Sequence, residues 1–523
     1  MKTLLTLFLM TLFAVSLRTV AADPLPVPIP GWDSAGKPSG WTFTDPGHVS
    51  IVHTSEDGEF VEVSLPFDAS NSTTGAQVDL PIDKVRGTVI EVSIEARAKD
   101  VSKPLSHYNG VKAQVNVVNP AQFDTFPRAY DANGDVYPVS YDWKRLTFQA
   151  RIPPTAAKAV LTLGLQDSTG TVDFRSVSAA ILRTAAMAPL VPPAGPVFTG
   201  HAPGMLRGVM INPFIKPGDV DTLKQWHVNV VRWQLKPESN AGLEVFDRSL
   251  DAQLKHLDEM LPVFKKAGIL VVLDLHRAIG KDALFHDASV QRHFTECWAT
   301  MAAKYRGEKQ IWGYDLLNEP TPAKGPGAVV AKLPNGVLDW RELAGVTAQR
   351  VRAIDPDHAI IVEPDPVALL DGLPFFKPLN VSGVVYSVHM YEPFYYTHQG
   401  VKDGILIGPV YPGNVGGVEW NKNQIRKEFQ PIADYARTFH VAVYVGEFSA
   451  VRWAKGADRY VNDVIDVMEE DHFDWTYHAF REWQGWNPEI GEEKNVTTPS
   501  LQPTARLTVL KHAFERNARP LAE

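Results

Sequence analysis

From residue 204 onward the chain alternates between short apolar runs and longer amphipathic segments, and this alternation constrains the fold more than any other feature. Runs typical of buried strands occur at 206–212, 228–235, 269–276, 312–318, 359–363, 384–391, 442–448 and 473–483. Amphipathic segments with helical spacing occur at 250–266, 290–305, 340–354, 425–439, 460–469 and 506–514. Eight β/α units in about 320 residues predict a (β/α)8 TIM barrel. A doubly wound open sheet is the alternative, but it normally has fewer units, and no glycine-rich phosphate turn follows the first strand.

Before residue 185 the apolar residues repeat with a period of two. Alternating runs occur at 60–67, 89–96, 112–118, 143–150, 159–165 and 172–177, with turn residues between them. Short strands of this kind predict an antiparallel sandwich. We therefore expect an all-β jelly-roll sandwich over 23–184 in front of a barrel domain over 204–523. The Pro- and Ala-rich stretch 185–203 is expected to be a linker.

The first residues have the pattern of a secretory signal peptide. Lys2 precedes an apolar run at 4–17, which is shorter than the ~20 residues needed to span a bilayer. Small residues at 20–22 are suited to cleavage before Asp23. We therefore predict that 1–22 is a signal peptide and that the protein is secreted, either to the extracellular space or to the periplasm. No later stretch is apolar enough to predict a membrane span.

Charge and cysteine content exclude several classes of function. The formal net charge of −9 at pH 7 argues against a nucleic-acid partner. Cys297 is the one cysteine, which excludes an intramolecular disulfide, a thiolate zinc cage and an iron–sulfur cluster. We expect Cys297 to be a buried structural thiol. We also expect no cofactor and a monomeric chain.

Polar residues gather where the predicted strands end, which is where active sites of (β/α)8 barrels form. The candidate site residues are Arg232, His276, Asn318, Glu319, His389, Tyr391, Glu447, His478, Trp483 and Trp486. Two of them, Glu319 and Glu447, place carboxylates at the ends of the fourth and seventh strands. Such a pair has the chemistry to cleave a glycosidic bond, with one group protonating the leaving oxygen and the other attacking the anomeric carbon. Asp274 and His276 also permit a metal-site interpretation, but the other ligands are not supplied in a convincing pattern.

Two motifs give the barrel a resemblance to a known family. Asn-Glu-Pro at 318–320 and Gly-Glu-Phe at 446–448 resemble glycoside hydrolase family five, the cellulase family of retaining barrel glycosidases. The resemblance covers roughly 204–517. It implies that Glu319 is the general acid/base and Glu447 the nucleophile of a two-step hydrolysis with retention of configuration.

The same resemblance implies supporting roles for other strand-end residues. Tyr391 is similar to the hydroxyl that hydrogen-bonds the nucleophile, and Arg232 to the cation that keeps the nucleophile ionised. Asn318 resembles the asparagine that binds the substrate 2-hydroxyl. His276 and His389 resemble histidines of the substrate subsites.

The sequence departs from the family at the eighth strand. The family usually places a tryptophan platform there under the sugar next to the cleavage point, and here His478 stands at that position. Trp483 and Trp486 are the candidates to replace it. The departure affects the substrate more than the two glutamates.

These observations predict a secreted retaining β-glycosidase with a β-linked glycan substrate, most simply an endo-β-1,4-glucanase. A β-mannanase, a β-1,3-glucanase, a glycolipid glycosidase and a transglycosylase remain alternatives on the same site, and a non-catalytic carbohydrate-binding protein is the alternative of another class. The sandwich resembles a carbohydrate-binding module, with a purely structural role as the alternative. The long segment 392–421, rich in aromatic residues, is expected either to form one wall of a substrate cleft or to pack against itself as a loop.

Overall fold

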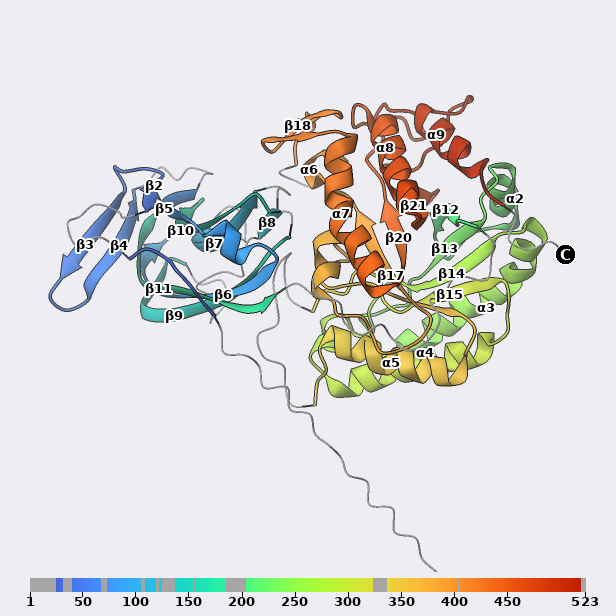
Figure 1. Ribbon diagram of the computed structural model, residues 1–523, viewed down its shortest axis with the longest axis horizontal. Helices are drawn as coiled ribbons and strands as arrows, with labels where there is room; N and C mark the ends of the chain where they lie inside the picture. The colour runs from blue at the N-terminus through green and yellow to red at the C-terminus, as the bar shows by residue number, and fades with distance from the viewer. Residues whose placement is uncertain are drawn as a thin grey trace, which may run out of the picture.

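The computed structural model describes residues 25–31, 40–66, 73–104, 109–118, 122–124, 137–154, 156–184, 204–322, 336–401 and 405–518. Within these ranges, antiparallel sheets precede a closed parallel barrel surrounded by helices (Figure 1). This arrangement confirms the predicted fold class. The predicted signal peptide and linker lie outside the described residues.

Two antiparallel sheets form the N-terminal part. One has the strand order β3-β4-β11-β6-β9, with β1 paired to β11, and the other has the order β2-β5-β10-β7-β8. The elements are β1 Leu25–Val27, β2 Trp41–Phe43, β3 Val49–Thr54, β4 Gly58–Leu65, β5 Thr73–Asp79, α1 Ile82–Val85, β6 Thr88–Val101, β7 Gly110–Val118, β8 Gln122–Asp124, β9 Val139–Ile152, β10 Lys158–Gln166 and β11 Gly170–Thr184. Alternate residues, such as Val111, Ala113 and Val115 of β7, are buried in one apolar core, as the period of two predicts.

Eight parallel strands close the barrel in the described part of the chain, and neighbours in the barrel follow one another in the sequence. They are β12 Arg207–Ile211, β13 Val230–Leu235, β14 Leu270–Leu275, β15 Ile311–Asp315, β16 Ala359–Val362, β17 Val384–Met390, β20 Ala442–Phe448 and β21 Asp474–Phe480. Seven of them fall within runs that the sequence predicted, and β15 begins one residue before its predicted run at 312–318. A small hairpin, β18 Gly413–Val415 and β19 Val418–Trp420, lies between β17 and β20.

Helices surround the barrel strands. They are α2 Pro217–Gln225, α3 Leu243–Ala267, α4 Ala288–Tyr305, α5 Trp340–Ile354, α7 Lys422–Phe439, α8 Ala457–Glu470 and α9 Ala505–Phe514. The sequence missed α2, which is short and begins with Pro-Gly. Between β16 and β17 the described chain has a 3-10 segment, Leu370–Phe375, because prolines at 364, 366 and 374 interrupt a regular helix. Among all described residues, no helix is both long and apolar enough to cross a membrane.

Side-chain alternation along the barrel strands decides which residues reach the interior. On β13, Val230 lies in an apolar cluster with residues from the other strands, and Arg232 follows it on the inner face with no exposed surface. Trp233, the next residue, points outward and packs edge-on against Phe264 of α3. Because side chains alternate between the two faces of a strand, Arg232 lies inside the barrel and Trp233 packs against the surrounding helices.

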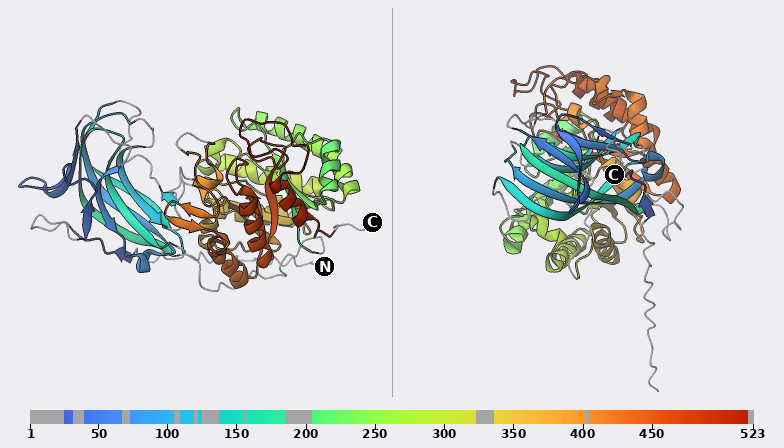
Figure 2. Two further views of the ribbon diagram at one scale, coloured as in Figure 1. Left: turned by 90° about the horizontal axis from the view of Figure 1, so that it is seen from above. Right: turned by 90° about the vertical axis from the view of Figure 1, so that its left-hand side faces the viewer.

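The sandwich and the barrel lie beside each other in Figure 1 and in the left view of Figure 2, and they share a contact at Arg151. This residue at the end of β9 is 2% exposed. Its guanidinium donates to the backbone carbonyl of Asp365 at 3.0 Å and lies over the ring of Phe375. The contact fixes the sandwich against the segment that follows β16.

Close packing of strands leaves no room for a side chain at Gly208 of β12. A Cβ there would lie 1.7 Å from the carbonyl oxygen of Val230 on the neighbouring strand. We expect Gly208→Ala to lower the free energy of unfolding by about 1–3 kcal/mol, because one of the two strands must move. Urea unfolding followed by tryptophan fluorescence measures the change.

Gly218→Ala is the matched control, because a Cβ at this position of α2 meets nothing within 4 Å. Alanine in a helix is expected to leave stability unchanged or raise it by about 0.4–1 kcal/mol. Equal unfolding midpoints for the two variants would contradict the strand packing described here.

Candidate active site

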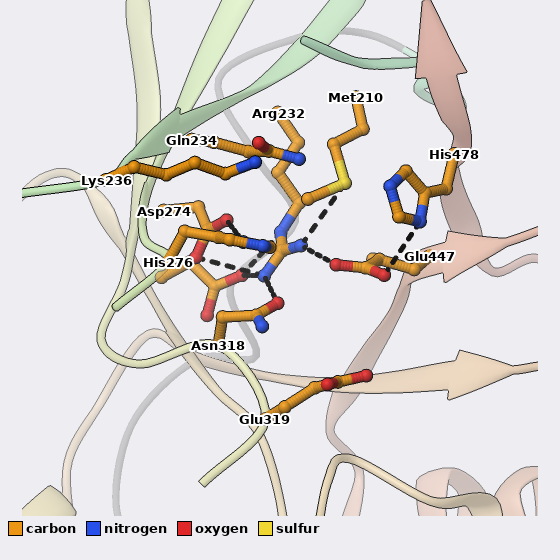
Figure 3. A network of polar contacts seen from close by, with 12 residues as sticks. Met210, Arg232, Gln234, Lys236, Asp274, His276, Asn318, Glu319, Glu447 and His478 are labelled. Carbon is orange, nitrogen blue, oxygen red and sulfur yellow. Dashed lines mark hydrogen bonds and ion pairs between the residues drawn. The ribbon is translucent and has the colours of Figure 1, made fainter. Parts of the chain in front are cut away.

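A buried guanidinium organises the carboxyl end of the barrel. Arg232 has no exposed surface, and its three nitrogens contact four carboxylates and one amide oxygen (Figure 3). The contacts are Nη1 to Glu447 at 2.8 Å, Nε to Asp315 at 2.9 Å, and Nη2 to Glu363 at 2.8 Å, Asp274 at 3.1 Å and Asn318 at 3.1 Å. Burial raises the pKa of Asp315 well above its ordinary value, so the neutral form of this one carboxyl is favoured. The other three carboxylates share the N–H donors of this one guanidinium.

Glu447 lies at the end of β20 and is 3% exposed. Its Oε1 accepts from Arg232, and its Oε2 accepts from the Tyr391 hydroxyl at 2.8 Å and lies 3.1 Å from Nδ1 of His478. Burial alone would raise the pKa of Glu447, but positive charge on His389, His478 and Arg232 holds it well below the ordinary value. The site therefore keeps this carboxylate ionised.

A glycine makes room for this arrangement. At Gly446, a Cβ would lie 2.8 Å from Oγ of Ser387 and 3.3 Å from Nε2 of His389. The register between β17 and β20 shifts at the same place, between Val388 and His389. This bulge directs Glu447 toward the barrel interior.

Glu319 follows β15 in a backbone conformation that few side chains adopt. Its φ is +45°, in the left-handed region. Its N–H donates to Oε2 of Glu363 at 2.6 Å, and its carboxylate lies 3.1 Å from Nδ1 of His389. The other ring nitrogen of His389 lies 3.1 Å from Oε1 of Glu363, so one buried carboxylate supports both the backbone and the side-chain partner of Glu319.

The two candidate glutamates lie close together but in different surroundings. One carboxylate oxygen of Glu319, one of Glu447 and a ring nitrogen of His389 all lie within 4.8 Å of one another. The Glu319 side chain is 37% exposed, whereas that of Glu447 is 4% exposed. One carboxyl is open to solvent, and the other is enclosed by donors.

The end of β21 adds a second ionic group. His478 lies beside Glu447, and its Nε2 lies 2.9 Å from Oε2 of Glu482. Glu482 also accepts from Lys236 at 2.5 Å and from Gln234 at 2.9 Å. On the eighth strand, where the sequence departs from the family, a chain of polar contacts therefore leads away from Glu447 toward the loop after β13.

Comparisons with known proteins identify the family of the barrel domain. The family model for cellulase, glycosyl hydrolase family 5, matches residues 199–484. The chain belongs to this family. It is therefore a glycoside hydrolase, as the resemblance implied.

Characterised relatives of this family 5 chain are distant. Endoglucanase C of Acetivibrio thermocellus is 23% identical over 295 residues, covering 49% of this chain and 81% of the relative. Cellodextrinase A of Ruminococcus flavefaciens is 24% identical over 277 residues, covering 51% and 74%. The crystal structure of the endoglucanase Cel5A from Thermotoga maritima is 22% identical with a TM-score of 0.47, covering 58% of this chain and 96% of that one.

The family 5 site includes most of the predicted residues. The amide oxygen of Asn318 accepts a hydrogen bond from Arg232, and Nδ1 of His276 lies 2.8 Å from a carboxylate oxygen of Asp274. His389 is 2% exposed, with both ring nitrogens occupied by glutamates. It therefore supports Glu319, and its role as a subsite histidine stays a prediction.

The two candidate tryptophans differ in exposure. Trp486 is 7% exposed and packs against the rings of Tyr391 and His478. Trp483 is 39% exposed and packs edge-on against Trp486. Of the two, Trp483 offers more surface to a ligand.

The aromatic residues of 392–421 mostly pack within the protein. Tyr396, Tyr411 and Trp420 are buried, and the first two pack with Tyr460 of α8. Tyr395 is 37% exposed. For the buried three, the loop that packs against itself is the better interpretation, and the cleft wall expected from them is not formed.

Two residues that contact the candidate site residues were missed by the sequence reasoning: Asp315 and Glu363. Glu363 follows β16 directly, so reading the polar residue at that strand end would have found it. Asp315 is the last residue of β15, but the predicted run extended to residue 318, so this residue was taken as part of the strand interior.

Two groups in the described residues bring His, Cys or acidic donors close enough to hold a cation. Glu319, His389 and Glu447 form one, but positive charge on Arg232 beside them disfavours a cation. Asp247, His293 and Cys297 form the other on the outer helices α3 and α4. Here burial and nearby carboxylates raise the pKa of Cys297 to about 12, so the thiol stays protonated, in keeping with the structural role predicted for it.

We expect that a lysine ammonium cannot replace the branched guanidinium of Arg232. In Arg232→Lys the ammonium cannot reach all of these carboxylates, which leaves buried charge unpaired. We expect a loss of about 3–5 kcal/mol in the free energy of unfolding, measured by urea denaturation.

The matched control is Arg350→Lys, which alters an exposed ion pair with Glu296. Its stability is expected to change by less than about 0.5 kcal/mol. If Arg232→Lys behaves like this control, the central role given to Arg232 is wrong.

Proposed function

We propose that the protein is a retaining β-glycosidase in which Glu319 is the general acid/base and Glu447 the nucleophile. The observation that carries this proposal is that one carboxylate oxygen of Glu319 and one of Glu447 lie within 4.8 Å of each other. Retaining enzymes hold the two carboxyls about 5–5.5 Å apart, whereas inverting enzymes leave about 6.5–9.5 Å for a water molecule.

The surroundings of each carboxyl support its assigned role. Glu447 is ionised and fixed by Arg232 and Tyr391, as an attacking carboxylate must be. The Glu319 side chain is 37% exposed, so a leaving group and then water can reach it. His389 orients it through one hydrogen bond. In the first step Glu447 attacks the anomeric carbon while Glu319 protonates the leaving oxygen, and in the second Glu319 deprotonates the incoming water.

For the substrate we propose a β-1,4-glucan cleaved within the chain. The names of the relatives, two endoglucanases and a cellodextrinase among them, support this choice. Trp483 at the end of β21 presents an exposed ring on which a sugar can stack. β-Mannan, β-1,3-glucan and glycolipid headgroups are the alternatives on the same two glutamates, and a sugar acceptor in place of water gives transglycosylation.

The proposal predicts which glycan is cleaved and by which groups. Purified protein is incubated with soluble β-1,4-glucan, β-1,3-glucan, mannan, xyloglucan and xylan, and new reducing ends are measured. We expect β-1,4-glucan to be the best substrate and Glu447→Gln to reduce its cleavage by at least about 1000-fold. Proton NMR of the first product is expected to show the β anomer.

Azide separates the two glutamates, because it is a small nucleophile that needs no general base. With an aryl glycoside whose leaving group needs no protonation, azide is expected to restore turnover to Glu319→Gln through a β-glycosyl azide. Glu447→Gln is expected to give no β product, and exposed Glu492→Gln is the control with wild-type rates. Activity of Glu447→Gln at wild-type level would overturn the assignment, and binding without cleavage on every glycan would favour a carbohydrate-binding protein.

We further propose export through the signal peptide 1–22 and glycan binding by the sandwich. N-terminal sequencing of the mature protein is expected to begin at Asp23. Retention of the full chain on insoluble cellulose, compared with a 204–523 truncation, tests the sandwich. Equal retention would assign the sandwich a purely structural role.

A further inference from the structure

A histidine contacts the candidate nucleophile from the end of β21. Nδ1 of His478 lies 3.1 Å from Oε2 of Glu447 and 2.5 Å from the hydroxyl oxygen of Tyr391. The Tyr391 hydroxyl in turn lies 2.8 Å from the same Oε2. Three polar atoms therefore meet in one triangle, and the protons on them decide how many donors Glu447 receives.

The far side of the ring fixes one of these protons. Nε2 of His478 faces Oε2 of Glu482 at 2.9 Å. Burial would raise the pKa of Glu482, but His478 and Lys236 hold it well below its ordinary value, so this carboxylate is only an acceptor. Nε2 therefore carries a hydrogen, and the proton on Nδ1 determines the charge of the ring.

Tyr391 has one hydroxyl proton and two acceptors in reach. When Nδ1 is protonated, it donates into the triangle, and the tyrosine proton is free to point at Glu447. When Nδ1 is bare, it competes with Glu447 for the tyrosine proton, because both lie within hydrogen-bond distance of the hydroxyl. In the second state Glu447 loses the His478 donor and shares the Tyr391 donor.

We propose that His478, held as a doubly protonated ring by Glu482, is a positioning residue that directs the Tyr391 hydroxyl at Glu447. This inference rests on the proposed role of Glu447 as the nucleophile. His478 stands where the family usually has a tryptophan platform, and the inference gives it a role in the reaction in place of stacking against the sugar.

The charges around the ring agree with this protonation state. Glu447 on β20 and Glu482 after β21 are the acidic groups in contact with His478. The basic groups lie one contact further away, with Arg232 and His389 on Glu447 and Lys236 on Glu482. Trp486 covers a face of the ring without adding charge. Burial lowers the pKa of His478, but the two carboxylates outweigh it and raise the pKa to about 9.

The first test follows the ring directly and needs no substrate. Long-range ¹H–¹⁵N NMR of the full chain, with the His478 signals assigned by their absence in His478→Asn, reports the charge on each imidazole. We expect the ring to be doubly protonated at pH 7 and to lose its proton near pH 9. Glu482→Gln is expected to lower that midpoint by about 1–3 pH units, because one of the two carboxylates is neutralised.

The second test uses a dinitrophenyl β-cellobioside, whose leaving group needs no protonation by Glu319. The pH dependence of kcat/KM then reports the state of the nucleophile and its donors. We expect the rate to fall above about pH 9 in the wild type and at lower pH in Glu482→Gln. In His478→Asn this decline is expected to disappear, and the plateau is expected to be about 10- to 100-fold lower, because a donor to a charged group is lost.

His472→Asn is the matched control. This exposed histidine lies two residues before β21 and has a φ of +59°, a conformation that asparagine also tolerates. Its rate and pH profile are expected to equal those of the wild type.

The outcomes separate this inference from the proposed function. A His478 ring that is neutral at pH 7, or a His478→Asn variant with the wild-type profile and rate, overturns the inference. If wild-type protein cleaves neither glycan nor aryl glycoside, the proposed function fails, and the NMR titration still decides the state of His478. If His478→Asn fails to fold, selective ¹⁵N labelling of histidine and the shift in Glu482→Gln identify the ring.

Discussion

A single buried arginine determines how the rest of the site is built. A guanidinium with no access to water is stable only when its donors are paired, and Arg232 reaches carboxylates from β14, β15, β16 and β20. These strands cannot shift relative to one another without leaving a buried charge unpaired. The same contacts leave Glu447 ionised and place Glu363 where it supports Glu319 and His389. Fold and chemistry are therefore coupled through one side chain.

The two candidate glutamates show how the barrel places the same chemical group in two different electrostatic environments. Glu447 is enclosed by cations and hydroxyls, whereas Glu319 has one ring donor and open solvent. The difference arises from backbone placement. The bulge at Gly446 turns one carboxylate inward, and the left-handed φ of Glu319 keeps the other at the rim. Burial and partners then separate their electrostatics.

Much of this could be predicted from the sequence, for physical reasons that differ from element to element. The eight barrel strands were predicted because strands buried on both faces are short, apolar and β-branched. Glu319 and Glu447 were predicted because polar residues at strand ends share one rim. The partners of Arg232 could not be predicted in full, since the register between strands decides which carboxylates meet it. The roles of His389 and Glu482 also depend on distances between distant segments. No helix was predicted between β16 and β17, and the structure has a 3-10 segment there.

The contact at Arg151 gives the N-terminal sandwich a consequence for the barrel that is independent of any affinity for sugar. Arg151 grips the carbonyl of Asp365, two positions beyond the carboxylate that supports both Glu319 and His389. The sandwich thus supports the loop that carries this carboxylate. An engineer who exchanges this module for another, or trims it away to obtain a smaller protein, removes a support from that loop as well as an accessory domain.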